Sequence, residues 1–308
     1  MDANVVLMKV LVLFILILVG YVARHLNVFS DDVTKGLNSI LIKITLPALI
    51  ISSLQKEFSP ELFTQSIQLL IISFSVYGCC FIFALLMPFI LKPRHAEKGV
   101  FQFIIMFSNV GFMGFPILSA IFGNEALFYA SIYNLPFNLL TFTLGVYLLV
   151  KNTDNGFRLA KEHILNPGVF AVVIGFIFFA ASIKLPVFIG EPLKLLGETT
   201  IPLSMFLIGA MLRKGKLHHI FMNWRIYVIS ILRLIIIPLI LFFSLKYFIS
   251  DKMLLGVIVM IGAMPAAAST PILAEEFGGS SEIAAQGVFI STLLSVFTIP
   301  LISLLFAG

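Results

Sequence analysis

Long runs of apolar residues alternate with short polar connections along the whole chain. A helix needs about 20 apolar residues to cross the hydrocarbon core of a bilayer. The runs show no alternation of apolar and polar positions, which a membrane-spanning β-barrel would require. The pattern therefore predicts an all-α polytopic membrane protein with ten transmembrane helices. The predicted spans are 4–24, 32–54, 64–91, 98–122, 125–150, 164–183, 191–212, 225–249, 253–277 and 281–306.

Composition agrees with this pattern. The 308 residues are 60% hydrophobic and 11% charged, whereas soluble domains carry about 25% charged residues. No polar stretch is long enough for a soluble domain. Because the chain begins without a basic segment and its first apolar run is long enough to span, we interpret that run as a helix rather than a signal peptide. Ser30 precedes the second span and is predicted to cap it.

Lysine and arginine are unevenly distributed over the two sets of loops. The connections after odd-numbered spans hold twelve basic residues, and the opposite side holds six. By the positive-inside rule, the richer side faces the cytoplasm, so both termini are expected outside. The same rule explains the net charge of +5 without a nucleic-acid partner.

Two spans contain residues that interrupt a regular helix. Residues 108–116 include two glycines and Pro116, which lacks an N–H donor. Residues 262–271 contain Pro265 and Pro271. A broken helix leaves unpaired backbone groups, and these are tolerated at bilayer depth only inside protein or beside a watery cavity. Such breaks form the midplane binding sites of many secondary transporters.

The breaks fall at equivalent places in an internal repeat. A shift of 155 residues aligns Gly20 with Gly175, Pro47 with Pro202, Pro116 with Pro271 and Gly123 with Gly278. Each half contains an odd number of spans, so the halves must be inverted. We expect residues 1–150 to form the first five-helix repeat and residues 151–308 the second, with the fourth and ninth helices broken.

Short motifs at these breaks resemble a known family. Asn109-x-x-x-x-Gly114-Phe115-Pro116 resembles the Asn-x-x-x-x-Gly-Ile-Pro motif of the auxin efflux carrier family, and Ala263-Met264-Pro265 followed by Thr270-Pro271 resembles its second crossover. That family includes plant PIN-FORMED exporters and bacterial carriers of malate or malonate type, and its fold is similar to that of bile acid–sodium symporters. The short connection after residue 150 is typical of a bacterial member, which implies the inner membrane.

The resemblance implies further features of fold and assembly. Spans 1, 2, 6 and 7 would form a scaffold, and spans 3–5 and 8–10 a transport domain in which helices 4 and 9 cross. The implied partners are a small organic anion, the lipid bilayer and a second copy of the chain.

The predicted substrate site lies at the two breaks. Helix N-termini attract carboxylates, and an asparagine amide adds a donor and an acceptor. Asn109 either binds the anion or only satisfies freed backbone groups, and the hydroxyls at the second break either bind the anion or bond to helix carbonyls. The candidates are Asn109, Gly111, Gly114, Pro116, Asn138, Pro265, Ser269, Thr270 and Pro271, together with Ser108 and Asn134.

Few ionisable residues fall within spans, and each is a functional candidate. Lys43 and Glu198 are 155 residues apart, so they occupy equivalent positions; they can pair, hold a coupling proton or reach an interface. Arg233 either attracts anions or extends to the cytoplasmic interface. Glu275 and Glu276 either line an exit path or lie at that interface.

Other classes of function fit the sequence less well. Every aspartate and histidine lies in a terminus, a loop or a span edge, so the sequence predicts no enzyme, metal site or cofactor. Ala266, Ala267 and Ala268 occupy much of the second break, which argues against a strong sodium site of the symporters' design. Backbone carbonyls can still bind the ion there. The alternatives that remain are an anion-selective channel and a ligand-binding membrane receptor.

Overall fold

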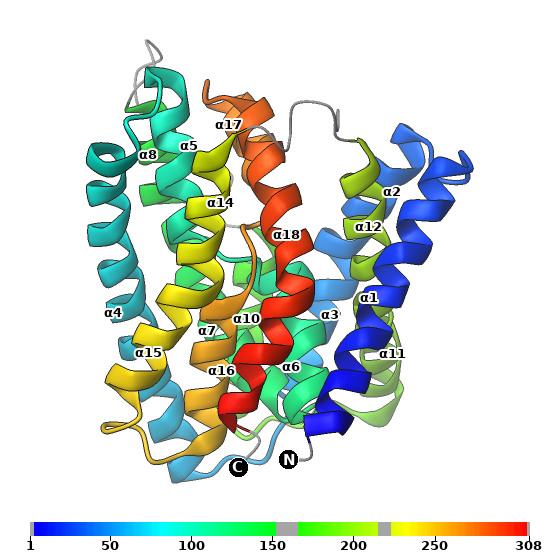
Figure 1. Cartoon of the computed structure of the whole chain (residues 1–308). Helices are drawn as coiled ribbons and strands as arrows, with labels where there is room; N and C mark the ends of the chain where they lie inside the picture. The colour runs from blue at the N-terminus through cyan, green and yellow to red at the C-terminus, as the bar shows by residue number, and fades with distance from the viewer. Residues whose placement is uncertain (1–2, 152–165, 215–222, 307–308) are drawn as a thin grey trace.

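The computed structural model describes residues 3–151, 166–214 and 223–306, which form helices joined by short connections (Figure 1). The first half contains α1 (Ala3–His25), α2 (Asp31–Ile40), η1 (Leu41–Thr45), α3 (Leu46–Ser53), α4 (Pro60–Leu91), α5 (His95–Met106), η2 (Val110–Gly114), α6 (Phe115–Phe122), α7 (Ala126–Leu140), η3 (Thr141–Gly145) and α8 (Val146–Val150). The second half contains α10 (Pro167–Ala180), α11 (Val187–Glu198), α12 (Thr200–Lys214), α14 (Trp224–Ile231), η4 (Leu232–Ile236), α15 (Ile237–Leu245), α16 (Lys252–Ala263), α17 (Thr270–Glu276), α18 (Ser281–Ser303) and η5 (Leu304–Phe306).

Helix lengths match a multi-pass membrane protein. Within the described residues, seven helical segments are long and apolar enough to cross a bilayer, and three shorter apolar helices cover Val110–Phe122, Pro167–Ala180 and Lys252–Ala263. Two of these shorter helices belong to the fourth and ninth predicted spans, which the structure interrupts. The ends of the predicted spans move by only a few residues, and Ser30 caps α2 by accepting a hydrogen bond from the Val33 N–H, as predicted.

Three of the π-helical turns precede a proline by the same spacing. Turns η1, η2 and η4 end two residues before Pro47, Pro116 and Pro238, respectively. A proline ring inside an α-helix clashes with the carbonyl four residues earlier and donates no hydrogen bond. The wider π turn relieves this conflict without ending the helix. The prolines therefore explain why these membrane helices are irregular at these points.

Large apolar side chains are exposed around the molecule. Ile15 of α1, Phe188 of α11 and Phe89 of α4 are 58%, 77% and 78% exposed, respectively. A soluble monomer rarely exposes such extended apolar surface, but the hydrocarbon of a bilayer covers it without cost. By contrast, the helices beside the two breaks, α5, α6 and α16, are among the most buried, so the breaks are shielded from lipid.

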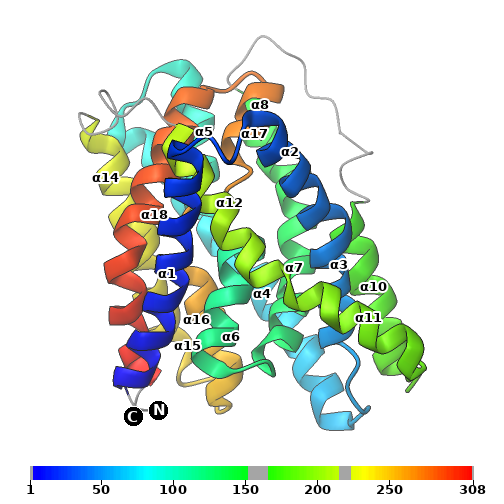
Figure 2. The ribbon, with the colours of Figure 1, turned by 90° about the vertical axis from the view of Figure 1, so that its right-hand side faces the viewer.

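Figures 1 and 2 show the packing of the helices from two sides. On one side, α1 packs on α12, and α3 packs on α10 and α11. On the other side, α4 packs on α5, α15 on α16 and α14 on α18. The start of α1 and the end of α18 lie at the same end of the molecule.

Two glycines with similar positive φ angles lie at the ends of α6 and α17. Gly123 ends α6 with φ +85°, and Gly278 follows α17 with φ +83°. Residues with a Cβ rarely adopt such angles. The two glycines are 155 residues apart, so equivalent turns in the two halves are built from the same residue type.

Candidate functional site

The two breaks pair with each other through their backbones. Ser108 forms an isolated antiparallel bridge with Ala266. The Asn109 N–H donates to the Pro265 carbonyl over 2.8 Å, and the Ala267 N–H donates to the Phe107 carbonyl over 3.1 Å. Each break thus satisfies backbone groups that the other leaves without helical partners, as burial away from water requires.

Asn109 lies at this junction with its side chain 4% exposed. It caps the helix that begins at Val110, because its Oδ1 accepts a 3.1 Å hydrogen bond from the Phe112 N–H. Its own carbonyl accepts from the Gly114 N–H over 2.9 Å. Within the described residues, Nδ2 donates no hydrogen bond. The backbone-capping role is therefore observed, and the amide donor is available for a ligand.

The other candidates of the first break shape its backbone. Pro116 lies in the first turn of α6, where a missing N–H costs nothing. A Cβ at Gly114 would lie 3.4 Å from the Asn109 carbonyl oxygen, whereas a Cβ at Gly111 would meet only the Leu46 side chain at 3.8 Å. Packing thus restricts position 114 more than position 111.

At the second break, the two hydroxyl groups differ in their hydrogen bonds to the backbone. The Thr270 hydroxyl donates to the Ala267 carbonyl, and Ser269 precedes α17 without a capping hydrogen bond from its side chain. Pro265 is buried and Pro271 lies in the first turn of α17. The Thr270 hydroxyl thus bonds to a backbone carbonyl of the non-helical segment between α16 and α17, rather than to a helix carbonyl.

Sequence reasoning missed Ser291 of α18. Its hydroxyl accepts a 3.1 Å hydrogen bond from the Ala266 N–H and donates to the Gly287 carbonyl over 2.7 Å. It therefore supports the extended segment of the second break from a neighbouring helix. Its only signal in the sequence is a polar residue within an apolar span.

Asn138 and Asn134 lie on α7, and Asn138 connects that helix to α10. Asn166 Nδ2 donates to Asn138 Oδ1 over 3.0 Å, and Asn138 Nδ2 donates to the Asn134 carbonyl over 2.8 Å. Asn166 also caps α10 through the Val169 N–H. The observed partners of Asn138 are therefore these residues rather than a group of either break.

Arg233 is buried at the paired breaks and is 2% exposed. Nη1 donates to the Ile105 carbonyl over 2.9 Å, and Nε donates to the Met264 carbonyl over 3.3 Å. The extension to the cytoplasmic interface that the sequence allowed is wrong, because the guanidinium contacts the ends of α5 and α16 instead.

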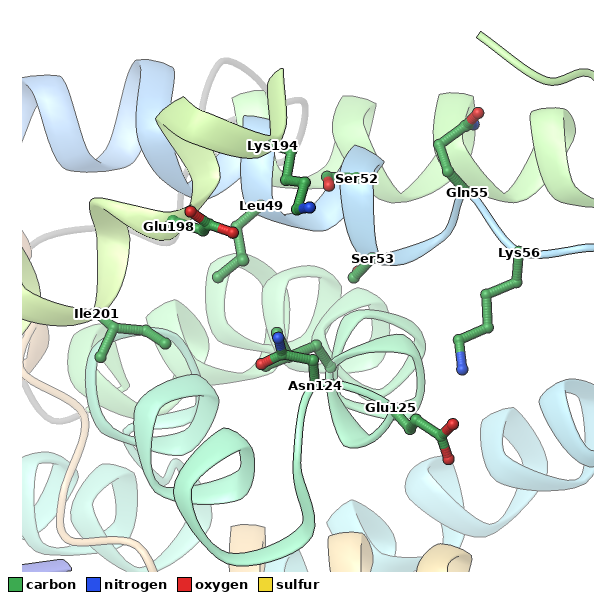
Figure 3. A pocket seen from close by; sticks show the side chains of 11 residues that line it. Leu49, Ser52, Ser53, Gln55, Lys56, Asn124, Glu125, Lys194, Glu198 and Ile201 are labelled. Carbon is green, nitrogen blue, oxygen red and sulfur yellow. The ribbon is translucent and has the colours of Figure 1, made fainter. Parts of the chain in front are cut away.

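Lys43 and Glu198 are both exposed, and they do not form an ion pair with each other in the described part of the chain. Glu198 lines a cavity of about 300 Å³ between α3, α11 and the α6–α7 connection. Figure 3 shows Lys194 and Glu198 on one wall and Asn124 and Glu125 on the opposite wall. Lys56, Ser52 and Ser53 line the same cavity. It offers charged groups of both signs at one end of the molecule.

Glu275 and Glu276 end α17 and are exposed, away from the buried junction. Among the described residues, no group of three histidine, cysteine or acidic side chains is placed to hold a metal ion. The chemistry available at the breaks is therefore hydrogen bonding by Asn109 and backbone amides beside one buried guanidinium.

Comparison with known proteins identifies a family and several relatives of this chain. The family of membrane transport proteins matches residues 5–157 and 153–303. An uncharacterized transporter of Methanocaldococcus jannaschii is 29% identical over 303 residues, which cover 95% of this chain and 96% of that protein. The uncharacterized transporter YfdV of Escherichia coli K12 is 26% identical over 300 residues, 94% of each protein. A putative malonate transporter of Rhizobium meliloti is 22% identical over 298 residues, 94% of this chain and 92% of that protein.

Proposed function

We propose, since the chain belongs to the membrane transport protein family, that it is a secondary transporter that moves a small organic anion across the membrane by alternating access. The observation that carries this proposal is the backbone pairing of the two breaks inside the protein. Discontinuous helices that meet at membrane depth are the usual place for substrate in such carriers. The auxin efflux carrier resemblance of the motifs agrees with the family match.

An anion suits this junction for two reasons. Asn109 leaves an amide donor available beside the N-terminal end of the helix Val110–Phe122, and helix N-termini favour negative charge. A hydrogen bond from such a donor to a carboxylate is stronger than one between neutral groups. The name of one relative, a putative malonate transporter, makes a dicarboxylate the first substrate class to test.

The proposal includes two inverted five-helix repeats whose fourth and ninth helices cross. Three observations support it. The two stretches matched by the family meet near residue 155, and Gly123 and Gly278 have nearly equal positive φ angles. In addition, α1 packs on α12, and α10 packs on α3. A shift of 155 residues relates α1 to α10 and α3 to α12, so the two contacts are equivalent in the proposed repeat. The scaffold would comprise α1–α3 and α10–α12, and the remaining helices would move with the substrate.

The orientation that we propose places both termini outside. The chain ends lie at the same end of the molecule as the connection between α6 and α7, and most basic residues belong to loops of the other end. The cavity that contains Lys194 and Glu198 would then open outward. It lies between helices of the proposed scaffold and the connection between α6 and α7.

Uptake into proteoliposomes tests the function. The purified protein is reconstituted, and uptake of labelled malonate, other dicarboxylates and monocarboxylates is measured with imposed pH, sodium and voltage gradients. We expect saturable uptake and counterexchange of internal with external substrate. Flux that never saturates and shows no counterexchange would indicate a channel, and binding without flux would indicate a receptor. Absence of both for every carboxylate would contradict the proposed substrate class.

A further inference from the structure

Arg233 bridges the C-terminal ends of the two interrupted helices. Ile105 lies in the last turn of α5, which ends at Met106, and Met264 directly follows α16, which ends at Ala263. One guanidinium donates to both carbonyls, over 2.9 Å and 3.3 Å. Arg233 itself lies in the π turn η4 and reaches both breaks from the neighbouring span.

In the part of the chain that the structure describes, the charge of this group is not paired with a carboxylate. No aspartate or glutamate in the described ranges forms an ion pair with Arg233, although the side chain is 2% exposed. A buried charge requires compensation. Here the compensation comes from the helix C-termini, each of which carries about half a negative charge. Two such ends together balance one guanidinium.

This position has a known use in secondary transporters. Half-helix C-termini and unwound carbonyls are the groups that coordinate a coupling cation there. In this chain the guanidinium bonds to carbonyls of that kind. A bound sodium ion would need the same oxygens and would be repelled by the fixed positive charge.

We propose that Arg233 is a resident cation that replaces the coupling cation at the paired breaks. This inference rests on the proposed transport function, because only a carrier has a coupling ion to replace. Arg233 neutralises the ends of α5 and α16 permanently, so the carrier keeps its fold and moves its anion without sodium. Arg233 is thus a positioning residue, which acts on substrate through the two breaks that it holds together.

Replacement of Arg233 tests this role directly. Arg233→Ala removes the charge and both hydrogen bonds, Arg233→Gln keeps a donor without charge, and Arg233→Lys keeps the charge without the planar fork. The melting temperature of each purified variant is measured in chloride salts of choline, sodium, potassium and guanidinium at equal millimolar concentration. Arg225 supplies a matched control, because it donates to the Leu91 and Lys92 carbonyls at the end of α4 but is partly exposed.

For the wild-type protein, we expect the melting temperature to be the same in all four salts. We expect the same independence of the salt for Arg233→Lys. Arg233→Ala and Arg233→Gln should melt about 5–10 °C lower in choline. Sodium or guanidinium should restore part of that loss with saturable concentration dependence, whereas Arg225→Ala should show no such restoration. In proteoliposomes, malonate uptake should be independent of sodium for the wild type and dependent on sodium for Arg233→Gln.

If the melting temperature of each of Arg233→Ala and Arg233→Gln is the same in all four salts, the inference is overturned. It is also overturned if sodium or guanidinium raises the melting temperature of Arg225→Ala by as much as that of the Arg233 variants. Failure of all three Arg233 variants to fold, even with guanidinium present, would also overturn it, because a free cation could not then replace the side chain. The melting series needs no substrate. If the wild-type protein takes up no malonate, that result counts against the proposed substrate. The melting series still tests the role of Arg233.

Discussion

Gly20 of α1 and Phe206 of α12 meet backbone to backbone: a Cβ added at Gly20 would lie 2.2 Å from the Phe206 carbonyl oxygen. At the equivalent place in the second half, a Cβ at Gly175 would lie 2.7 Å from the Leu54 side chain and 3.4 Å from the Ile51 Cα. Positions 206 and 51 are also 155 residues apart. Small residues let membrane helices approach closely, and that packing drives their association.

Gly20→Ala should therefore destabilise the protein, because the new methyl group meets rigid backbone and must force α1 away from α12. Overpacking of this kind costs about 1–3 kcal/mol. We expect a lower melting temperature and lower expression. Gly78→Ala is the matched control, since nothing lies within 4 Å of a Cβ at Gly78 and alanine favours the helix. A Gly20→Ala protein as stable as Gly78→Ala would contradict this close approach.

Asn109 variants separate the capping role from the proposed binding role. Asn109→Ala loses the cap on the Phe112 N–H, at a cost of about 0.5–2 kcal/mol, and also loses the amide donor. Asn109→Asp keeps an acceptor for the cap but places a carboxylate against the anion. A hydrogen bond to a charged acceptor contributes about 1.5–3 kcal/mol, so malonate affinity should fall roughly 10- to 100-fold in Asn109→Ala.

Asn109→Asp should bind more weakly still, with near-normal thermal stability. The measurement is the melting temperature together with malonate affinity for both variants. A folded Asn109→Asp protein that retains wild-type affinity would remove Asn109 from the substrate site and leave it as a helix cap.

Ser53 of α3 and Ser131 of α7 connect the proposed scaffold to the proposed moving helices, with their hydroxyl oxygens 2.8 Å apart. If α7 moves against α3 during transport, this contact must break. A Ser53→Cys and Ser131→Cys pair, in a background without Cys79 and Cys80, should form a disulfide upon oxidation and stop malonate uptake, and reduction should restore uptake. Each single variant serves as a control. Full uptake with the disulfide formed would show that these helices do not separate.

The pair Glu57 and Lys184 predicts a small dependence of stability on pH. The hydrogen bond and charge of Lys184, at 2.6 Å, lower the pKa of Glu57. A lowered carboxylate pKa stabilises the fold above the unfolded value of about 4.3, and this contribution disappears as the pH falls through the lower folded value. Because both side chains are exposed, Glu57→Gln should change the melting temperature slightly at pH 7.

The difference between wild type and Glu57→Gln should vanish near pH 3. Melting curves at pH 7 and pH 3 measure it. If the difference in melting temperature grows as the pH falls, the ion pair between Glu57 and Lys184 does not stabilise the fold in the way described.

Thiol labelling of cells tests the orientation. Single cysteines are placed at Lys92, which directly follows α4, and at Lys184, which lies between α10 and α11, again without Cys79 and Cys80. The end of α4 and the start of α11 lie at opposite ends of the molecule (Figure 1). An impermeant maleimide should label Lys184→Cys in intact cells and Lys92→Cys only after the membrane is opened. The reverse pattern would invert the proposed topology.

The sequence by itself determined the features that depend on local chemistry. Apolar run length is enough to predict the spans, and proline and glycine are enough to predict that the backbone breaks near Pro116 and Pro271, because a missing N–H or Cβ acts within one helical turn. The cap at Ser30 follows for the same reason. The equal spacing of the two halves was likewise visible, since a repeat is a property of residue order.

Only the tertiary structure decided which distant groups meet. Arg233 lies 128 residues from Ile105 and 31 from Met264, and nothing local distinguishes it from an arginine that reaches the interface. Asn138 joins Asn166, and Glu198 faces a cavity rather than Lys43. Apolar periodicity is uninformative in a bilayer, where lipid and protein are equally apolar, so it does not determine which helix faces meet. The packing of the helices determines where these polar groups lie and therefore which residues they contact.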